Sequence, residues 1–435
     1  MVSKTVHPAA RVSGTWEVPG DKSISHRAVI LGALSNRVCE VDNFLTGDDC
    51  LSTVNAFRQM GIAIELEGTH LRIHGQGLEG LKSPKQAMDC GNSGTTARLM
   101  MGVLTGHPFE VDMIGDASLS RRPMGRVIEP LSKMGAFFRT VKGQALPASP
   151  TLPLSIVGTR SVRPLSWKSP VASAQVKSAI LLAGLYASGT TEVSEPTQSR
   201  DHTERMLKAC SVSVETKGTT VRLQGTAVIR ASRFQVPGDL SSAAFLIATG
   251  LLLAQDELVV RQVGVNPTRT GVIDVLKAMG ASCRLLQTTE WGGEPVADIA
   301  VKKSVLKGAR IFGDLIPRSI DELPLLAALA TQAQGKTVIA DAQELRVKES
   351  DRLTTFREEF SKMGARVSEK PDGLEIEGPT RLRGTVVSSH GDHRLAMSLA
   401  IAALVAEGQT TIEDVSCVET SFPGFWSLLE SACGR

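Results

Sequence analysis

The chain reads Leu-Ser-Lys-Met-Gly-Ala at residues 131–136, and related phrases recur along its whole length. Three clear copies and two weaker ones, in which Met is replaced, stand at 57–61, 276–281, 360–365, 207–211 and 429–434. Six copies in 435 residues give a repeat unit of about 72 residues. Because solenoid repeats run about 20 to 50 residues, the longer period favours closed domains over an open scaffold.

Each phrase predicts the end of an amphipathic outer helix. Gly stands near the C-cap position of most copies, and a strand-like alternation follows, as at 63–66 and 365–368. Between the phrases lie stretches rich in Ala, Gly and Leu that are apolar nearly all round, which predicts buried inner helices. Six such helices are expected to open near Lys22, Asn92, Ser173, Ser241, Asp321 and Asp392.

A second, longer repeat divides the chain in two. Val-Pro-Gly-Asp-Lys-Ser at 18–23 returns as Val-Pro-Gly-Asp-Leu-Ser at 236–241, which is 218 residues later. Pro and Gly interrupt helix and strand, so both phrases predict places where the chain passes between halves. We therefore expect two domains of three repeat units each, one of residues 22–235 and one of residues 1–21 with 236–435.

Composition narrows the possible partners. The net charge is only +3, and one Tyr and four Trp offer few surfaces for stacking bases, which argues against nucleic acid. Apolar stretches such as 243–254 are shorter than the roughly 18 to 20 residues of a membrane helix, and the N-terminus lacks an apolar secretion signal. We expect a cytoplasmic protein without a membrane partner. Seven scattered cysteines predict reduced thiols, without disulfides or zinc.

Small, polar and charged residues gather where the inner helices are expected to begin. They occupy residues 21–27 (Asp-Lys-Ser-Ile-Ser-His-Arg), 91–98, 173–177 and 391–394. A helix N-terminus presents backbone N–H groups and the positive end of the helix dipole, so such residues there predict an anion site. Several of these sites predict the binding of more than one anion.

Two acidic positions are candidates for chemistry. In Lys-Glu-Ser-Asp-Arg at 348–352, the spacing would place Lys348, Glu349 and Arg352 on one helical face, with Asp351 as an N-cap and ion-pair partner of Arg352. Asp321 opens an apolar helix, where it fits either dipole stabilisation or catalysis.

Motifs for cofactors are incomplete. Gly-Lys-Thr at 335–337 lacks the first Gly of a phosphate loop, because Ala330 stands in its place. His390 and His393 have no second His or Cys cluster to complete a metal shell. We expect no metal, no nucleotide site and no cofactor.

The charged stretches also carry a family resemblance. Residues 21–27, 91–95, 122–125, 173–175, 346–352 and 391–394 follow the order of the motifs in 5-enolpyruvylshikimate-3-phosphate (EPSP) synthases, and the whole chain resembles that family. The resemblance implies an α/β fold of two similar domains, each of three βαβαββ units in an inverse α/β-barrel-like arrangement, with the N-terminal strand in the C-terminal domain. It also implies a monomer that transfers the enolpyruvyl group of phosphoenolpyruvate to the 5-hydroxyl of shikimate 3-phosphate, releasing phosphate through a tetrahedral intermediate.

The same resemblance implies roles for individual residues. The shikimate 3-phosphate contacts would be Lys22, Ser23, Arg27, Ser173, Ala174, Gln175, Arg200, Asp321 and Lys348. The phosphoenolpyruvate contacts would be Lys22, Asn92, Gly94, Arg122, Gln175, Arg352 and Arg394. The catalytic proton transfers would belong to Asp321 and Glu349, assisted by Lys22.

Some details bear on subclass and on alternatives. Residues 173–175 and 200–202 resemble the second class of the family, Thr420 replaces a Lys of many members, and Gly94, where tolerant members carry Ala, implies sensitivity to glyphosate. The UDP-N-acetylglucosamine enolpyruvyl transferases share the architecture and the donor, but they carry a reactive Cys in a loop where residues 115–123 have none. A non-catalytic anion-binding scaffold also stays open at this point.

Overall fold

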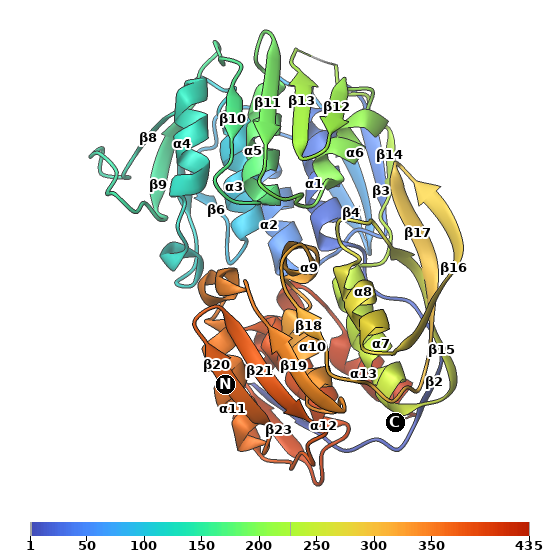
Figure 1. Cartoon of the computed structure of the whole chain (residues 1–435). Helices are drawn as coiled ribbons and strands as arrows, with labels where there is room; N and C mark the ends of the chain where they lie inside the picture. The colour runs from blue at the N-terminus through green and yellow to red at the C-terminus, as the bar shows by residue number, and fades with distance from the viewer. Residues whose placement is uncertain (1, 227, 435) are drawn as a thin grey trace. The chain divides into compact units, whose positions relative to one another are not determined.

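The structure is a computed structural model that describes residues 2–226 and 228–434 (Figure 1). The chain divides into an N-terminal unit, Gly20–Val236 with Glu290–Glu294, and a C-terminal unit, Met1–Pro19, Pro237–Thr289 and Pro295–Arg435. Both main crossings fall inside the repeated Val-Pro-Gly-Asp phrases. The expected boundaries did not place Glu290–Glu294 in the N-terminal unit, where Glu294 Oε1 lies 2.8 Å from His202 Nδ1 and Arg205 donates to the Gly293 carbonyl at 2.9 Å.

The described residues of the N-terminal unit form three four-stranded sheets with one connection pattern. In each, a parallel pair is followed by two strands that join antiparallel. The strand orders are β14 (Arg233–Gln235), β3 (Val38–Asp42), β5 (His70–His74), β4 (Ile64–Glu67); β6 (Met88–Asp89), β7 (Glu110–Ile114), β9 (Leu154–Val157), β8 (Phe137–Arg139); and β10 (Ser166–Lys168), β11 (Thr190–Ser194), β13 (Thr220–Gln224), β12 (Val214–Lys217).

The C-terminal unit repeats this pattern, with strands from both ends of the chain. In the described chain, two of its sheets have four strands. Their strand orders are β2 (Val12–Trp16), β15 (Ala254–Gly264), β17 (Glu294–Lys302), β16 (Ser282–Trp291); and β18 (Arg310–Ile311), β19 (Gly335–Ile339), β21 (Gly373–Gly378), β20 (Arg366–Lys370). A third sheet contains β22 (Val386–Ser388), β23 (Thr410–Glu413) and β1 (Ser3–Val6). The N-terminal strands thus belong to the C-terminal unit. In the described chain, five sheets have the four strands of the predicted βαβαββ repeat, and the sixth has three.

The inner helices lie close to the predicted places and are almost wholly buried. They are α1 (Lys22–Leu34), α3 (Gly94–Leu104), α5 (Ala174–Gly184), α7 (Leu240–Leu253), α10 (Leu323–Ala330) and α12 (His393–Ala403). Small residues allow them to approach closely. A Cβ on Gly102 of α3 would lie 2.3 Å from the Ala179 carbonyl oxygen of α5. The apolar composition of these stretches therefore reflects packing between helices.

The outer helices end at the repeated phrase, as predicted. They are α2 (Asp48–Gln59), α4 (Gly125–Met134), α6 (His202–Ala209), α8 (Gly271–Ala278), α11 (Arg352–Lys362) and α13 (Phe425–Ala432). Met134 is fully buried, and Gly135 takes the left-handed conformation that ends α4, with φ of 116°. Three 3-10 turns, η1 (Leu119–Arg121), η2 (Gln343–Val347) and η3 (Val415–Thr420), and the short helix α9 (Leu315–Ser319) join these elements in the described chain.

Each unit has its own apolar core, built from its helices and sheet faces. Over the described ranges, no helix combines the length and apolar character that crossing a membrane requires. Of the described cysteines, Cys39, Cys50, Cys90, Cys210 and Cys283 are buried, and Cys417 and Cys433 are partly buried.

Candidate functional site

In the N-terminal unit, the predicted anion-binding residues begin the inner helices. Lys22 is the first residue of α1, Gly94 of α3 and Ala174 of α5. The preceding residue caps each helix, and Asp21, Ser93 and Ser173 accept hydrogen bonds from N–H groups of the first turn. These caps fix the positive helix ends beside the charged residues.

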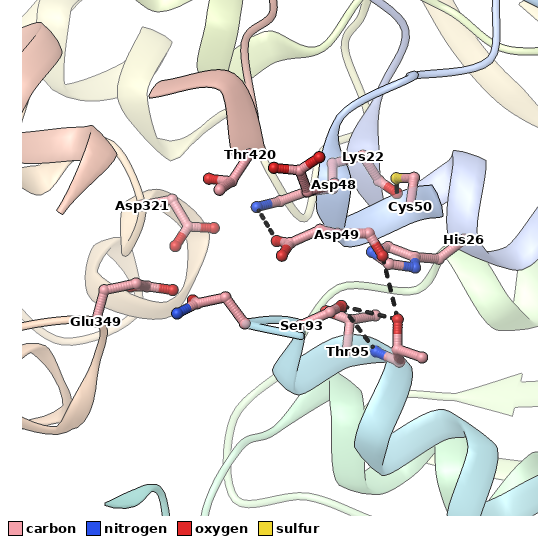
Figure 2. A network of polar contacts seen from close by, with 12 residues as sticks. Lys22, His26, Asp48, Asp49, Cys50, Ser93, Thr95, Asp321, Glu349 and Thr420 are labelled. Atoms are coloured by element: carbon pink, nitrogen blue, oxygen red, sulfur yellow. Dashed lines mark hydrogen bonds and ion pairs between the residues drawn. The ribbon is translucent and has the colours of Figure 1, made fainter. Parts of the chain in front are cut away.

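Lys22 is held by a partner that the sequence analysis missed. Its Nζ lies 2.9 Å from Oδ2 of Asp49, and both side chains are partly exposed (Figure 2). Asp49 follows Asp48 in the first turn of α2, where two acidic residues suggest only dipole stabilisation from sequence. The ion pair orients the Lys22 ammonium group without removing it from solvent.

Arg27 is buried on α1 and anchored by hydroxyl groups. Nε donates to Thr203 Oγ1 at 2.6 Å, NH2 donates to Ser178 Oγ at 2.7 Å, and NH1 donates to the Ser23 carbonyl at 2.9 Å. The pKa of Arg27 is lowered to about 10, chiefly by burial; nearby carboxylates, Glu204 first, oppose this shift, and the positive charge of Arg200 adds to it. Arg27 remains a cation at neutral pH, and it and Arg200 are close enough to interact electrostatically.

Asn92 and Arg122, both predicted to contact phosphoenolpyruvate, are hydrogen-bonded to each other. Arg122 donates from NH2 to Asn92 Oδ1 at 2.8 Å and from NH1 to the Asn92 carbonyl at 3.2 Å. Asn92 in turn donates to Asp116 at 2.6 Å. The Arg122 guanidinium is thereby held beside the start of α3.

Gly94 lies close to two guanidinium groups. A Cβ there would lie 2.7 Å from NH1 of Arg98 and 3.4 Å from NH1 of Arg122. Arg98, which the sequence analysis did not select, donates to Gln175 Oε1 at 2.7 Å and to the Pro123 carbonyl at 3.2 Å. Gln175 also donates to Thr95 Oγ1 at 3.0 Å. Arg98 therefore connects the starts of α3 and α5.

In the C-terminal unit, the centre of the site is Arg352, which is 3% exposed. Nε donates to Asp392 at 2.7 Å, NH2 donates to Glu349 at 2.6 Å, and NH1 lies 3.7 Å from Asp321. Figure 2 shows the carboxylates of Asp321 and Glu349 turned toward one another. Burial acts to lower the pKa of Arg352, but Asp392 and Glu349 outweigh it and raise that pKa.

Two details of the 348–352 interpretation are wrong. Lys348 and Glu349 lie between η2 and α11 and share no helical face with Arg352, because Asp351 caps α11 and the helix begins at Arg352. Asp351 is the predicted cap, but its ion-pair partner is Arg346, at 2.8 Å, and not Arg352. The predicted pair of Glu349 and Arg352 does form.

The other predicted residues of this unit have distinct surroundings. Burial lowers the pKa of Lys348, and the negative charge of Asp321 opposes this lowering. Arg394, the second residue of α12, is 5% exposed, and its backbone N–H donates to Asp392 at 2.8 Å. Thr420 donates to the Cys417 carbonyl at 2.7 Å.

In the part of the chain that the structure describes, no group of three or more His, Cys, Asp or Glu could hold a metal ion. Of the two histidines considered from sequence, His390 lies 2.7 Å from the Glu359 carboxylate through Nε2.

A buried ion-pair triad lies beside the predicted residues of α5. Lys177 pairs with Glu195 and Glu204, each at 2.9 Å. Glu195 also accepts a hydrogen bond from the Ser173 N–H at 2.8 Å. Lys177 belongs to the charged stretch 173–177, but its partners could not be predicted from the sequence. A lysine in an otherwise apolar helix was the available indication of a buried carboxylate.

Comparison with known proteins gives consistent matches over the whole chain. The family model described as EPSP synthase (3-phosphoshikimate 1-carboxyvinyltransferase) matches residues 6–429. The 3-phosphoshikimate 1-carboxyvinyltransferases of Brevibacillus brevis and Desulforamulus reducens are 51% and 49% identical, covering 98% of this chain and of each relative. A solved EPSP synthase from Acinetobacter baumannii has a TM-score of 0.88 and 43% identity, covering 99% of this chain and 98% of that one. The enolpyruvyl transferase NikO from Streptomyces tendae has a TM-score of 0.77 at 18% identity, covering 98% of this chain and 96% of that one, a likeness of fold alone.

Proposed function

The chain belongs to the EPSP synthase family, and on that premise we propose which side chains bind the substrates and carry out the reaction. The chain is an enzyme of aromatic amino-acid biosynthesis with 3-phosphoshikimate 1-carboxyvinyltransferase activity. It transfers the enolpyruvyl group of phosphoenolpyruvate to the 5-hydroxyl of shikimate 3-phosphate and releases phosphate.

We assign shikimate 3-phosphate to the starts of α1 and α5 and to the cations near them. The contacts are Lys22, Ser23, Arg27, Ser173, Ala174, Gln175 and Arg200, with Asp321 and Lys348 from the C-terminal unit. Capped helix N-termini and the anchored Arg27 suit a phosphate group, because backbone N–H groups and a fixed guanidinium need little reorganisation to bind it.

Phosphoenolpyruvate carries a phosphate and a carboxylate, and both suit arginine. We assign it to Lys22, Asn92, Gly94, Arg122, Gln175, Arg352 and Arg394. The guanidinium of Arg122 is already held by Asn92, which supports two-pronged recognition of an anion. The missing side chain of Gly94 leaves room at the start of α3.

The observation that carries the catalytic assignment is the contact of one buried guanidinium, Arg352, with both Asp321 and Glu349. In the proposed addition step, Asp321 accepts the 5-hydroxyl proton as that oxygen bonds to C2 of phosphoenolpyruvate. Glu349 gives a proton to the methylene carbon, and Lys22 assists. In the elimination step, the bond from C2 to the phosphate oxygen breaks, a methyl proton returns to Glu349 and the double bond is restored, while the proton held by Asp321 leaves with the phosphate. Two carboxylates in different surroundings can divide acid and base roles.

The test is phosphate release by the purified protein with phosphoenolpyruvate and either shikimate 3-phosphate or UDP-N-acetylglucosamine. We expect release only with shikimate 3-phosphate, and a loss of about a hundredfold or more in Asp321→Asn. Release only with the nucleotide sugar would contradict the assignment, as would full activity of Asp321→Asn. The absence of Cys from residues 115–123 already disfavours the nucleotide-sugar enzymes.

We further propose the second class of the family for this chain, supported by Ser-Ala-Gln at 173–175 and Arg-Asp-His at 200–202. A cytoplasmic monomer is part of the same proposal. Gly94 supports sensitivity to glyphosate, which competes with phosphoenolpyruvate. Turnover that persists unchanged at high inhibitor concentration would contradict that sensitivity, and light scattering of the purified protein tests the monomer.

A further inference from the structure

The ion-pair triad of Lys177, Glu195 and Glu204 is buried in the N-terminal unit. Lys177 Nζ lies 2.9 Å from Glu195 Oε2 and 2.9 Å from Glu204 Oε1, and all three side chains are at most 3% exposed. Burial acts to lower the pKa of Lys177, but the two carboxylates outweigh it and raise that pKa. Removing three charged groups from water is costly, so the triad need not add stability to the fold.

Glu195 joins two segments that lie apart in the sequence. Its Oε1 accepts a hydrogen bond from the Ser173 N–H at 2.8 Å. Its Oε2 accepts from Ser199 Oγ at 2.7 Å and from the Ser199 N–H at 3.3 Å. Ser173 caps α5, and Ser199 immediately precedes Arg200. One carboxylate therefore holds both the start of α5 and the segment that carries Arg200.

Lys177 reinforces this arrangement from the other side. It donates to the Ser199 carbonyl at 3.4 Å while it pairs with Glu195. The neighbouring residues Ser178 and Thr203 accept the hydrogen bonds of Arg27, and their hydroxyl oxygens lie 2.7 Å apart. The anchors of Arg27 are thus sequence neighbours of Lys177 and Glu204.

Glu204 differs from Glu195 in one useful respect. It pairs with the same lysine at the same distance and is buried to a similar extent. Within the described residues, however, its carboxylate accepts no hydrogen bond apart from the contact with Lys177. Glu204 therefore shares the charge of Glu195 but holds neither serine segment.

We propose that Glu195, held in place by Lys177, is a positioning residue for shikimate 3-phosphate. It fixes the spacing between the start of α5 and Arg200, so that both meet the phosphate-bearing substrate without reorganisation. The inference rests on the proposed function, which assigns Ser173 and Arg200 to that substrate. Arg122 and Asn92, assigned to phosphoenolpyruvate, are held by their own mutual bonds on other elements.

The experiment compares Glu195→Gln with the matched control Glu204→Gln in the full chain. Each change replaces one of the two carboxylates beside Lys177 with a neutral amide of the same size. In Glu195→Gln, the new amide N–H₂ group faces either the Ser173 N–H or the Ser199 and Lys177 donors, so one set of hydrogen bonds is lost. The readouts are the Kd of shikimate 3-phosphate by calorimetry, the KM of each substrate, and the melting temperature.

We expect Glu195→Gln to raise the Kd of shikimate 3-phosphate about tenfold or more, the effect of losing hydrogen bonds to a charged group. In Glu195→Gln, the KM of phosphoenolpyruvate should change less than about threefold. In Glu204→Gln, the Kd of shikimate 3-phosphate and the KM of each substrate should all change less than about threefold. Equal effects of the two substitutions would overturn the proposal, because they would indicate a charge or stability effect. An unchanged Kd in Glu195→Gln would also overturn it.

A second variant keeps the proposal testable if Glu195→Gln does not fold. Ser199→Ala removes the 2.7 Å hydrogen bond to Glu195 and leaves every charge in place. It should raise the Kd of shikimate 3-phosphate about threefold, and no change would count against the proposal. If the wild-type protein binds no shikimate 3-phosphate, the proposed function itself fails. Wild-type binding with unaltered affinity in the variants would overturn the positioning role alone.

Discussion

The Arg352 guanidinium donates to Glu349 at 2.6 Å, although the two residues are assigned different tasks, one in binding phosphoenolpyruvate and one in protonating its methylene carbon. The contact holds the Glu349 carboxylate beside the guanidinium that the proposed function assigns to phosphoenolpyruvate. An anion bound by Arg352 would therefore lie next to the proposed acid.

Glu349→Gln should keep the fold and slow the chemical step by about a hundred- to ten-thousandfold, because an amide cannot transfer a proton to carbon. Arg352 retains Asp392 at 2.7 Å, so its burial stays compensated. Single-turnover kinetics with quenched product analysis measures the step directly. A variant with an unchanged single-turnover rate would refute the acid role of Glu349.

Asp392→Asn should lower the free energy of unfolding by about 3 kcal/mol, because it removes the closest fully buried partner of Arg352. Asp351→Asn is the matched control. Asn also caps helices, and the pair of Asp351 with Arg346 is partly exposed, so the loss should stay below about 1 kcal/mol. Urea denaturation of both variants gives the comparison. Similar losses of unfolding free energy in Asp392→Asn and Asp351→Asn would show that the buried pair contributes no more than the partly exposed one.

Gly94→Ala should raise the KM of phosphoenolpyruvate about tenfold, because the new Cβ would lie 2.7 Å from Arg98 NH1 and displace it. Gly125→Ala is a suitable control, since its Cβ would meet only Pro150 at an ordinary 3.6 Å. Steady-state kinetics with each substrate varied in turn distinguishes the two. An equal effect of Gly125→Ala would mean that the loss is not specific to the start of α3.

Burial lowers the pKa of His107 to about 4 and lowers that of His26 well below its ordinary value. Below about pH 6.5 the unfolded chain binds protons that the folded chain does not, so stability falls as the pH falls from 6.5 toward 4. His107→Gln should reduce the slope of the free energy of unfolding against pH by about 1.4 kcal/mol per pH unit. Urea denaturation at pH 7, 6 and 5 tests it, with the exposed His7→Gln for comparison. A slope that His107→Gln leaves unchanged would contradict the lowered pKa of His107.

Burial also raises the pKa of Cys39, Cys90 and Cys210 to about 12. Because the thiolate is the reactive form, these residues should label slowly with a disulfide reagent at pH 8 and rapidly in urea. Mass spectrometry of the labelled peptides identifies each site. Labelling of Cys90 in native protein as fast as in urea would show that its thiol is accessible.

The repeat architecture could be predicted because its signals are local. Met134 fills a buried position at the end of α4, and Gly135 takes a left-handed conformation, so the two residues together mark a helix end. The start of α11 was predicted less well. Asp351 caps the helix only two residues after Glu349, and spacing alone cannot show where a helix begins.

The partners of the site residues were harder to predict because they are distant in sequence. Lys177 finds Glu195 and Glu204 on separate elements, and Arg352 finds Asp392 forty residues later. Residues 290–294 join the N-terminal unit through contacts of Glu294 and Gly293, for which no local pattern exists. Such pairings follow from tertiary packing, which helix and strand propensities do not encode.

The placement of β1 has a consequence for the order of folding during synthesis. Ser3 pairs with Glu413, so β1 leaves the ribosome long before the strand with which it pairs. Most of the N-terminal unit is continuous in sequence and can begin to pack while translation proceeds, whereas the C-terminal unit needs both ends of the chain. A closure over so many residues costs entropy before it gains contacts and folds slowly. A nascent chain stalled before β23 should therefore leave β1 exposed to proteases and chaperones.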